Sequence, residues 1–162
     1  MRRFFVFILF CFVSLLLFSC KNEQYAKPQD TTLHANKEVR YIVARNYFAN
    51  NTLSDTANMQ MIINTQAEFD KYFSPAAYMG KGGQPTQIDF NHQKAICFIL
   101  PVTNIATDIN CNILNTDQNT KATTIYYNVL LGEEISYSIR PCLIVLVNKE
   151  DISEKVEFIR KK

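Results

Sequence analysis

Glycine and histidine are scarce in this chain, which has four glycines and two histidines among its 162 residues. Three of the glycines lie in the segment Ala76–Phe90 (AAYMGKGGQPTQIDF), a composition that raises the question of a phosphate-binding loop. A P-loop needs four residues between its first glycine and Gly-Lys-Ser/Thr, and then a helix whose N-terminal amides face the phosphates. Here the order is Gly-Lys-Gly-Gly-Gln-Pro-Thr, a strand-like piece follows, and GxGxxG is absent. The spacing excludes a standard nucleotide loop and leaves a backbone nest for a small anion as the remaining ligand role.

The sequence also lacks a metal-binding pattern. His34 lies in a polar segment, and no histidine stands near Cys97, Cys111 or Cys142, which occupy apolar runs without CxxC spacing. We therefore predict no zinc site and no cofactor, and expect these cysteines to act as small buried hydrophobes. Three thiols allow at most one internal bridge. If a hairpin centred on Asn104 forms, it places Cys97 opposite Cys111, the pair we favour.

No nucleophile motif of the GxSxG type is present. His92 stands in FNHQK just before an apolar run, with Asp89 three residues upstream. A hydrolase would need the fold to bring a serine or cysteine against His92. A histidine in a turn is the simpler interpretation, so an envelope hydrolase or small-ligand binder using His92 and Asp89 is kept as the alternative function.

An excess of positive charge is missing as well. The whole chain has 17 Lys+Arg and 15 Asp+Glu, and removal of residues 1–20 would take away Arg2 and Arg3, leaving 15 of each sign. Binding to nucleic acid or to an anionic membrane surface requires excess positive charge. The composition therefore argues against a nucleic-acid partner.

What is present begins with a targeting segment, MRRFFVFILFCFVSLLLFSC. Arginines followed by an apolar run too short to span a bilayer are typical of a secretory signal. The ending Leu-x-Ser-Cys resembles the lipobox of bacterial lipoproteins, in which the cysteine is acylated and the peptide before it is removed. By that resemblance residues 1–20 are a lipoprotein signal peptide and Cys20 carries a stable lipid anchor. An uncleaved N-terminal anchor helix is the alternative. The residue after Cys20 is Lys21 and not the aspartate that retains lipoproteins in the inner membrane, so the sequence favours the outer membrane.

Composition divides the rest of the chain into a tether and a domain. Residues 21–38 are polar, with few aliphatic side chains and no periodicity, which is typical of a flexible tether. Residues 39–162 form one domain of ordinary size that can bury a core of its own.

The pattern of the domain predicts an α+β, mainly β fold, with an antiparallel meander sheet or small sandwich and one short helix packed on it. Thr65 and Glu68 have the spacing of a capping box, which predicts a helix over 66–73. Residues 95–100 and 143–147 are continuously apolar, so we expect the sheet to be covered on both faces. The predicted strands are 39–48, 59–63, 95–100, 108–115, 123–131, 143–147 and 155–159, with a short edge strand at 135–139 and a turn at 132–134.

Three segments of the domain resemble the C-terminal domain family of the protease-complex subunit PrcB, found in secreted bacterial lipoproteins. They are TQAEFDKYF, PTQIDFNHQKAICFIL, and PCLIVLV followed by KVEFIR, and they cover roughly residues 60 to 160. The resemblance implies a β-rich extracytoplasmic domain that can serve a secreted protease complex as a partner. It brings no catalytic residues.

The sequence therefore predicts a lipid-anchored, non-enzymatic module of the cell envelope that binds or assembles with another protein. The glycine-rich loop is interpreted as a mobile hinge and, with neighbouring strand edges, as the candidate contact surface. The residues of that candidate loop are Tyr78, Met79, Gly80, Lys81, Gly82 and Gly83.

Overall fold

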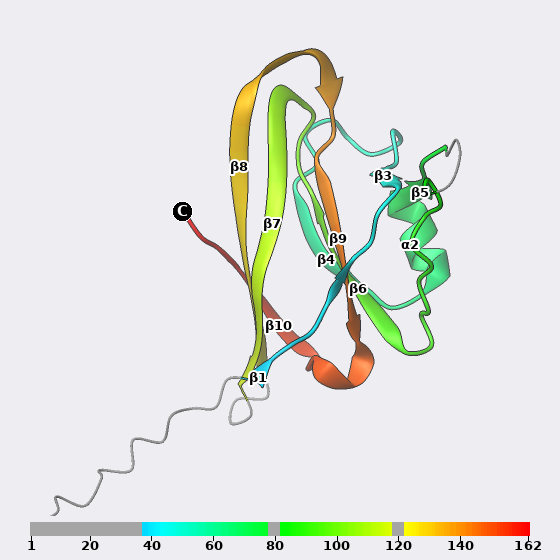
Figure 1. Cartoon of the computed structure of the whole chain (residues 1–162), viewed down its shortest axis with the longest axis vertical. Helices are drawn as coiled ribbons and strands as arrows, with labels where there is room; N and C mark the ends of the chain where they lie inside the picture. Colours follow the sequence, from blue (N-terminus) through cyan, green and yellow to red (C-terminus); the bar gives the residue numbers. More distant parts are fainter. Residues whose placement is uncertain (1–36, 78–81, 118–121) are drawn as a thin grey trace, which may run out of the picture. The chain divides into compact units, whose positions relative to one another are not determined.

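The computed structural model describes residues 37–77, 82–117 and 122–162, which all belong to one compact unit, His34–Lys162 (Figure 1). The predicted signal peptide, residues 21–36 of the predicted tether, and Tyr78–Lys81 lie outside the described residues. The described part is mainly β with one α-helix, which confirms the predicted fold class. In chain order the elements are β1 (Lys37–Glu38), β2 (Ile42–Val43), β3 (Tyr47–Ala49), β4 (Met59–Ile63), α2 (Gln66–Tyr72), β5 (Phe73–Pro75), β6 (Gln93–Ile99), β7 (Thr103–Asp117), β8 (Ala122–Ile139), β9 (Cys142–Asn148), the 3-10 turn η1 (Lys149–Asp151) and β10 (Lys155–Arg160).

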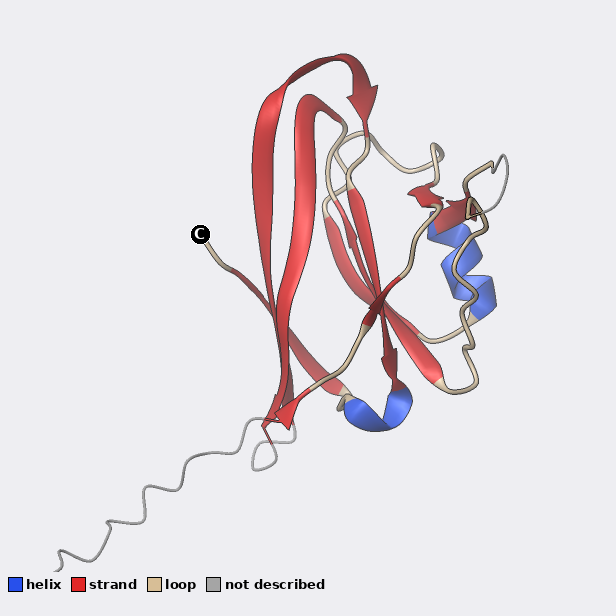
Figure 2. Cartoon of the chain, in the orientation of Figure 1, coloured by secondary structure: helices blue, strands red, loops and turns tan. Residues whose placement is uncertain are grey.

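Two four-stranded sheets make up a sandwich (Figure 2). The first sheet has the order β1-β7-β8-β10 and the second the order β2-β9-β6-β4. Within these sheets the strand pairs are antiparallel, except that β10 runs parallel to β8. Because β6 and β9 are neighbours although β7 and β8 separate them in sequence, the arrangement is the sandwich of the two predicted alternatives and not a simple meander.

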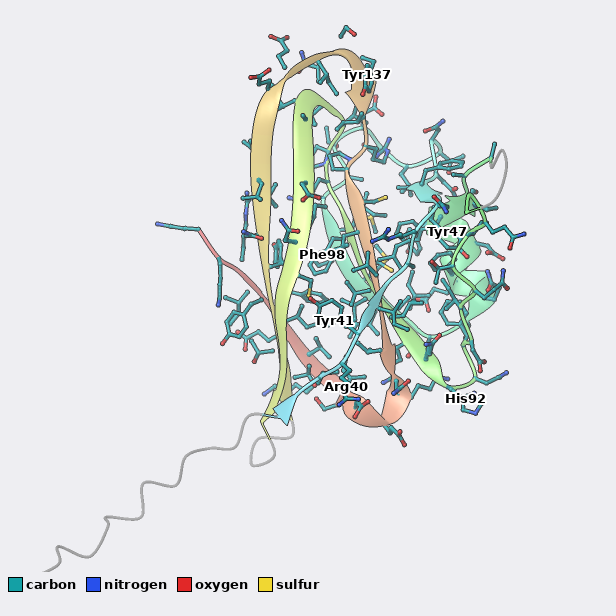
Figure 3. All side chains as sticks on the ribbon, viewed as in Figure 1. Arg40, Tyr41, Tyr47, His92, Phe98 and Tyr137 are labelled. Atoms are coloured by element: carbon teal, nitrogen blue, oxygen red, sulfur yellow. The ribbon has the colours of Figure 1, made fainter. Side chains whose placement is uncertain are left out.

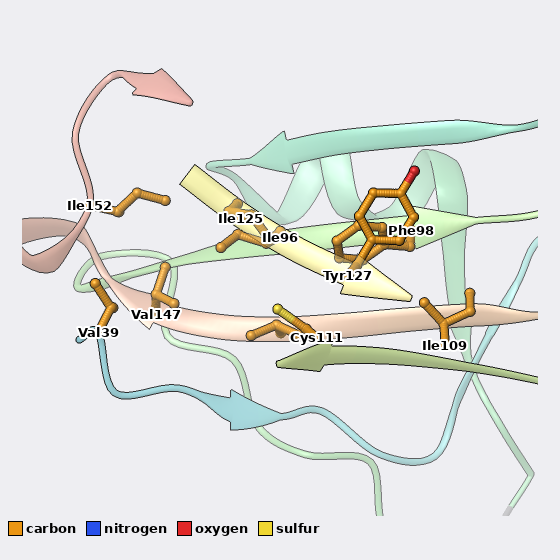
Figure 4. Packing of buried hydrophobic residues seen from close by; sticks show 10 residues of the cluster. Val39, Ile96, Phe98, Ile109, Cys111, Ile125, Tyr127, Val147 and Ile152 are labelled. Atoms are coloured by element: carbon orange, nitrogen blue, oxygen red, sulfur yellow. The ribbon is translucent and has the colours of Figure 1, made fainter. Parts of the chain in front are cut away.

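The main core lies between the two sheets (Figure 4). Phe98 of β6 is fully buried there, with its ring centroid 4.8 Å from that of Tyr127 and 5.6 Å from that of Phe158. Tyr127 and Phe158 belong to strands of the first sheet, so these aromatic contacts join the sheets face to face. The other buried members are Val39, Ile96, Ile109, Cys111, Ile125, Val145, Val147 and Ile152.

A second core covers the opposite face of the second sheet. Phe69 of α2 lies at its centre, with ring centroids 5.0 Å from Phe73, 5.2 Å from Tyr47 and 5.8 Å from Phe90. The helix and the small β3–β5 sheet therefore form a third layer. Strands β6 and β9 are buried on both faces, which confirms the prediction made from the two apolar runs.

Helix α2 begins as the capping box predicts. The Thr65 side chain accepts a hydrogen bond from the Glu68 amide at 3.2 Å. The Glu68 carboxylate accepts at 3.4 Å from the amide of Asn64, one residue before the cap. The helix ends at Tyr72, and the chain passes directly into β5.

The prediction of one strand over residues 39–48 is wrong. Between residues 37 and 49 the chain crosses all three layers, so β1, β2 and β3 pair with β7, β9 and β5 in three different sheets, and residues 39–48 hold only β2 and the beginning of β3. Asn46 has a φ of 64°, a left-handed conformation that breaks the extended path just before β3. Residue preference for strand was correct locally, but one straight strand cannot contact three layers.

The predicted turn at residues 132–134 and the turn of the predicted hairpin centred on Asn104 are also wrong, because both positions lie inside long strands. β7 already begins at Thr103, and β8 runs without interruption through Gly132, Glu133 and Glu134. The irregular register between β7 and β8 at this end lets the ribbon bend without ending.

The predicted hairpin of residues 95–100 and 108–115 does not form. β6 pairs with β4 and β9, whereas β7 pairs with β1 and β8. Cys97 of the second sheet points into the second core and Cys111 of the first sheet points into the main core, so the second sheet separates the two thiols. The proposed Cys97–Cys111 disulfide is therefore corrected: Cys97, Cys111 and Cys142 are free thiols.

Candidate functional site

His92 and Asp89 come together in the turn before β6. The His92 Nδ1 atom lies 2.6 Å from the Asp89 Oδ2 atom, and this hydrogen bond is the main cause that lowers the pKa of the Asp89 carboxyl. The His92 side chain is 81 % exposed and that of Asp89 54 %. The Asp89 backbone oxygen also accepts from the amides of His92 and Gln93, so the pair closes a surface turn (Figure 3).

A shallow hollow of about 260 Å³ adjoins this turn. It is lined by Asn91, His92, Asn148, Lys149 and Glu150, a set with no serine or cysteine. The side chains of His92 and Asp89 are therefore hydrogen-bonded, as the predicted pair requires. The pair has polar neighbours that can contact a small ligand, but no hydroxyl or thiol of that lining can act as the nucleophile of a hydrolase.

The described part of the glycine-rich loop is held firmly against β3. The Thr86 amide and hydroxyl exchange hydrogen bonds with the backbone of Arg45, and the Tyr47 hydroxyl donates to the Thr86 carbonyl at 2.9 Å. The side-chain amide of Asn46 donates to the backbone carbonyl of Gly82 at 3.3 Å and to that of Gln84 at 2.9 Å. This anchoring contradicts a mobile hinge over residues 82–86.

Of the six residues in the predicted contact loop, Gly82 and Gly83 are described. Gly82 has a φ of 94°, which glycine adopts without strain, so the expectation of unusual backbone angles is met at this position. The remaining four lie outside the described residues, so the loop stays a prediction as a contact surface.

Among the described residues, no group of three or more His, Cys, Asp or Glu side chains converges to hold a metal ion. Burial raises the pKa of the Cys111 thiol to about 11 and raises the pKa of Cys97 and Cys142 as well. Protonated buried thiols are poor nucleophiles and poor metal ligands.

A different surface, which the sequence did not single out, lies where β7 and β8 bend over one end of the sandwich. We call it the arch, and define it as residues 103–107 of β7 and 130–139 of β8 (Figure 1). Register irregularities follow Thr103 and Ile105 in β7. Two hydrogen bonds hold this bend. The Thr107 hydroxyl donates to the Ile105 carbonyl at 2.8 Å, and the side-chain amide of Asn104 donates to the Glu134 carboxylate at 2.6 Å.

Gly132 allows the two strands of the arch to approach closely. A Cβ atom at this position would lie 3.2 Å from the Ala106 Cβ atom and 3.3 Å from the Ala106 carbonyl oxygen. Both distances are shorter than ordinary van der Waals contact, so the absence of a side chain at Gly132 shapes the arch.

Large apolar side chains are exposed on the arch. Leu130 is 52 % exposed, Leu131 70 % and Tyr137 65 %, and Tyr137 stands at the outermost end of the sandwich in Figure 3. Two hollows flank Leu131. The first, of about 220 Å³, is mostly apolar and is lined by Leu100, Pro101, Thr103, Ile105, Thr107, Val129, Leu131 and Pro141. The second, of about 360 Å³, is lined by Ala106, Thr107, Asp108, Leu130, Leu131 and Gly132.

The charges that remain free around the arch are acidic. Asp108, Glu133 and Glu134 are exposed. Arg140, at the end of the arch, is turned inward with its side chain 8 % exposed. Its guanidinium donates to the carbonyls of Leu53 and Ser54 and to the Asp55 carboxylate.

The arch lies at the end of the sandwich opposite to β1, where the described chain begins (Figure 1). Within the described residues, no helix is both long enough and apolar enough to cross a membrane. A chain held at its N-terminal side would therefore present the arch on its far end.

Sequence reasoning missed the arch because each of its features has an ordinary local explanation. The signal that could have indicated it is Leu130, an apolar residue at an outward position of a strand that otherwise alternates. The Gly132-Glu133-Glu134 segment that follows suggested a turn, which separated Leu130 from Tyr137 in the predicted fold.

Comparison with protein-family models, with curated proteins and with solved structures gives no match for this chain.

Proposed function

We propose that this chain is a lipid-anchored lipoprotein of the bacterial cell envelope, held in the outer membrane and not in the inner membrane, whose domain binds a protein partner without catalysing a reaction. The lipobox-like ending at Cys20 supports the anchor, and the resemblance to the PrcB family supports a partner in a secreted protease complex. The observation that carries the binding role is the exposed apolar surface of the arch, with Leu131 70 % exposed at the end away from β1. Leu131 borders both hollows of the arch, and an exposed apolar surface of this kind is typical of an interaction site.

The binding role is tested with the full-length lipoprotein in its own membranes. A photo-crosslinking amino acid replaces Tyr137, and cross-linked proteins are identified by mass spectrometry. We expect one dominant partner whose yield falls about tenfold when Leu131→Ser is added, since buried apolar anchors dominate interface energy. The matched control is Ile42→Ser, which removes another exposed apolar side chain, 57 % exposed and located on β2.

The absence of a cross-linked partner, or equal loss with Ile42→Ser and Leu131→Ser, would argue against binding through the arch. The anchor is tested separately, because Cys20→Ser removes the acylated thiol. We expect this variant to remain unprocessed and to incorporate no labelled palmitate; normal labelling would show that Cys20 is not the anchor.

A second candidate, a small-ligand site at His92, rests on the 2.6 Å contact with Asp89 beside the 260 Å³ hollow. A ligand bound there would perturb the backbone amide signals of Asn148 and Lys149 in an NMR titration, and His92→Ala would abolish that response. The structure of the arch and of its 220 Å³ hollow should be unaffected by this variant.

A further inference from the structure

The outer edge of β8 is covered along only part of its length. β7 pairs with one edge of β8 from Ala122 to Ile139. On the other edge, β10 pairs only with residues 122–127, and the last contact is the hydrogen bond from the Lys161 amide to the Tyr127 carbonyl at 2.7 Å. Beyond Tyr127, no strand among the described residues lies beside this edge, and Figure 1 shows the end of β10 diverging from it.

The pairing also shows which backbone groups face this open edge. The N–H and C=O groups of successive residues in a strand point to alternate sides. Since the Tyr127 carbonyl points to the β10 side, the N–H and C=O of Val129 and Leu131 point to the same side. Those of Asn128 and Leu130 point to β7, where their partners are Asn110 and Asp108.

Natural proteins usually protect such edges with charged residues, proline or bulges. The segment Asn128–Leu131 has none of these on β8, and charged residues begin only at Glu133. Two exposed leucines accompany the free backbone groups. The edge is therefore a template for one more strand.

We propose that the partner of the arch supplies an extended segment that pairs, as an added strand, with the open edge of β8 at Val129 and Leu131. This inference rests on the proposed function and specifies its mode. Main-chain hydrogen bonds supply affinity in such strand addition, and pockets for alternate side chains supply specificity. The exposed side chains of Leu130 and Leu131 are the apolar contacts that β8 offers to the alternate side chains of an added strand.

The charge of the arch indicates the chemistry of that segment. Asp108, Glu133 and Glu134 are exposed, and the nearby Arg140 is engaged with the 53–55 loop. A segment with alternating apolar residues and with lysine or arginine at its arch end complements this surface.

Other occupants fit less well. A second copy could share only Asn128–Leu131, because its own β10 occupies the edge before this segment. The segment 21–36 of the same chain is polar and has no alternating apolar pattern. A separate protein segment can follow β8 onto the arch and reach its acidic residues.

The test uses the full-length lipoprotein in detergent micelles and a short synthetic peptide in which valine and threonine alternate. A pair of lysines stands at its N-terminus in one version and at its C-terminus in another, because parallel and antiparallel addition place opposite ends at the arch. Binding is followed by fluorescence anisotropy, and amide hydrogen exchange is measured with and without peptide. We expect one version to bind and to slow exchange at Val129 and Leu131, while exchange at Asn128 and Leu130 is already slow without peptide.

Variants test whether peptide binding depends on the backbone edge of β8 or only on non-specific contact with exposed apolar side chains. Leu131→Pro removes an N–H that faces the open edge, a position where a sheet tolerates proline, and should weaken peptide binding at least about tenfold. Leu130→Lys places a protective charge beside the same edge and should weaken binding similarly. A scrambled peptide of equal composition is the matched ligand control.

Failure of both peptides to bind, or binding without slower exchange at Val129 and Leu131, would overturn strand addition. Concentration-dependent protection of these amides without peptide would overturn it in favour of a dimer. If Leu131→Pro lowers the yield of the Tyr137 cross-link no further than Leu131→Ser, which also removes the leucine side chain but keeps the backbone N–H, the proposed function stands and this mode of binding falls.

Discussion

Arg140 illustrates how much a single side chain can contribute once the fold takes it out of solvent. Its guanidinium donates to the carbonyls of Ser54 and Leu53 at 2.8 and 3.0 Å and to the Asp55 carboxylate at 3.1 Å. The Asp55 side chain is 85 % exposed, whereas that of Arg140 is 8 % exposed. The backbone carbonyls are therefore the partners that lose most when the guanidinium is removed.

We predict that Arg140→Met lowers the free energy of unfolding by about 2–3 kcal/mol, because the carbonyls of Leu53 and Ser54 lose the charged donor that holds their loop. Asp55→Asn should cost less than about 1 kcal/mol, as for other exposed ion pairs. Urea unfolding of both variants measures the difference. Equal losses would mean that the ion pair, and not the backbone contact, stabilises this loop.

The buried thiols carry a second prediction at this scale. Because burial raises the pKa of Cys111 to about 11, its neutral thiol dominates at pH 8 and reacts poorly with iodoacetamide. Mass spectrometry of labelled peptides should show Cys97 and Cys111 modified only after denaturation. Rapid labelling of either in the folded protein would contradict their burial.

At the scale of elements, short local signals explain how α2 begins but not what it packs against. Thr65 and Glu68 specify the start of the helix, and the chain then enters β5 immediately after Tyr72. The helix is short, so packing of Phe69 against Phe73, Tyr47 and Phe90 must stabilise it.

We predict that Thr65→Ala destabilises the domain by about 1 kcal/mol, the usual cost of losing an N-cap. Thr65→Ser keeps the hydroxyl and should stay within about 0.5 kcal/mol of the parent, as substitutions that keep the key contact do. Thermal unfolding followed by circular dichroism compares them. A loss of equal size in Thr65→Ser would point to the methyl group instead of the cap.

For the whole molecule, stability depends on holding two sheets and a third layer together. Phe98 is central to this because it is fully buried in β6 and contacts Tyr127 and Phe158 of the facing sheet. Figure 4 shows the rings of Phe98 and Tyr127 meeting in the core between the two sheets.

We predict that Phe98→Ala lowers the free energy of unfolding by about 3–5 kcal/mol, a large share of the stability of an ordinary domain. Phe98→Leu keeps most of the volume and should cost less than about 1.5 kcal/mol. Denaturant unfolding measures both values. A small effect of Phe98→Ala would mean that the sheets do not depend on this contact.

The amino-acid sequence alone determined the local features of this protein. Alternation and apolar runs indicated most of the strands, and the double burial of 95–100 and 143–147 was predictable because such runs cannot face water. The capping box at Thr65 and the turn at Asp89 and His92 were local as well, since each depends on residues close in sequence.

Only the tertiary structure decided which strands are neighbours. Cys97 and Cys111 lie in different sheets and in different cores because β6 pairs with β9 across a long intervening hairpin, a non-local choice that residue preference does not encode. The same choice makes β8 continue beyond β10 and leaves the backbone of Val129 and Leu131 open. Hydrogen bonds between distant strands carry no signature in either strand, so this edge could be found only in the folded chain.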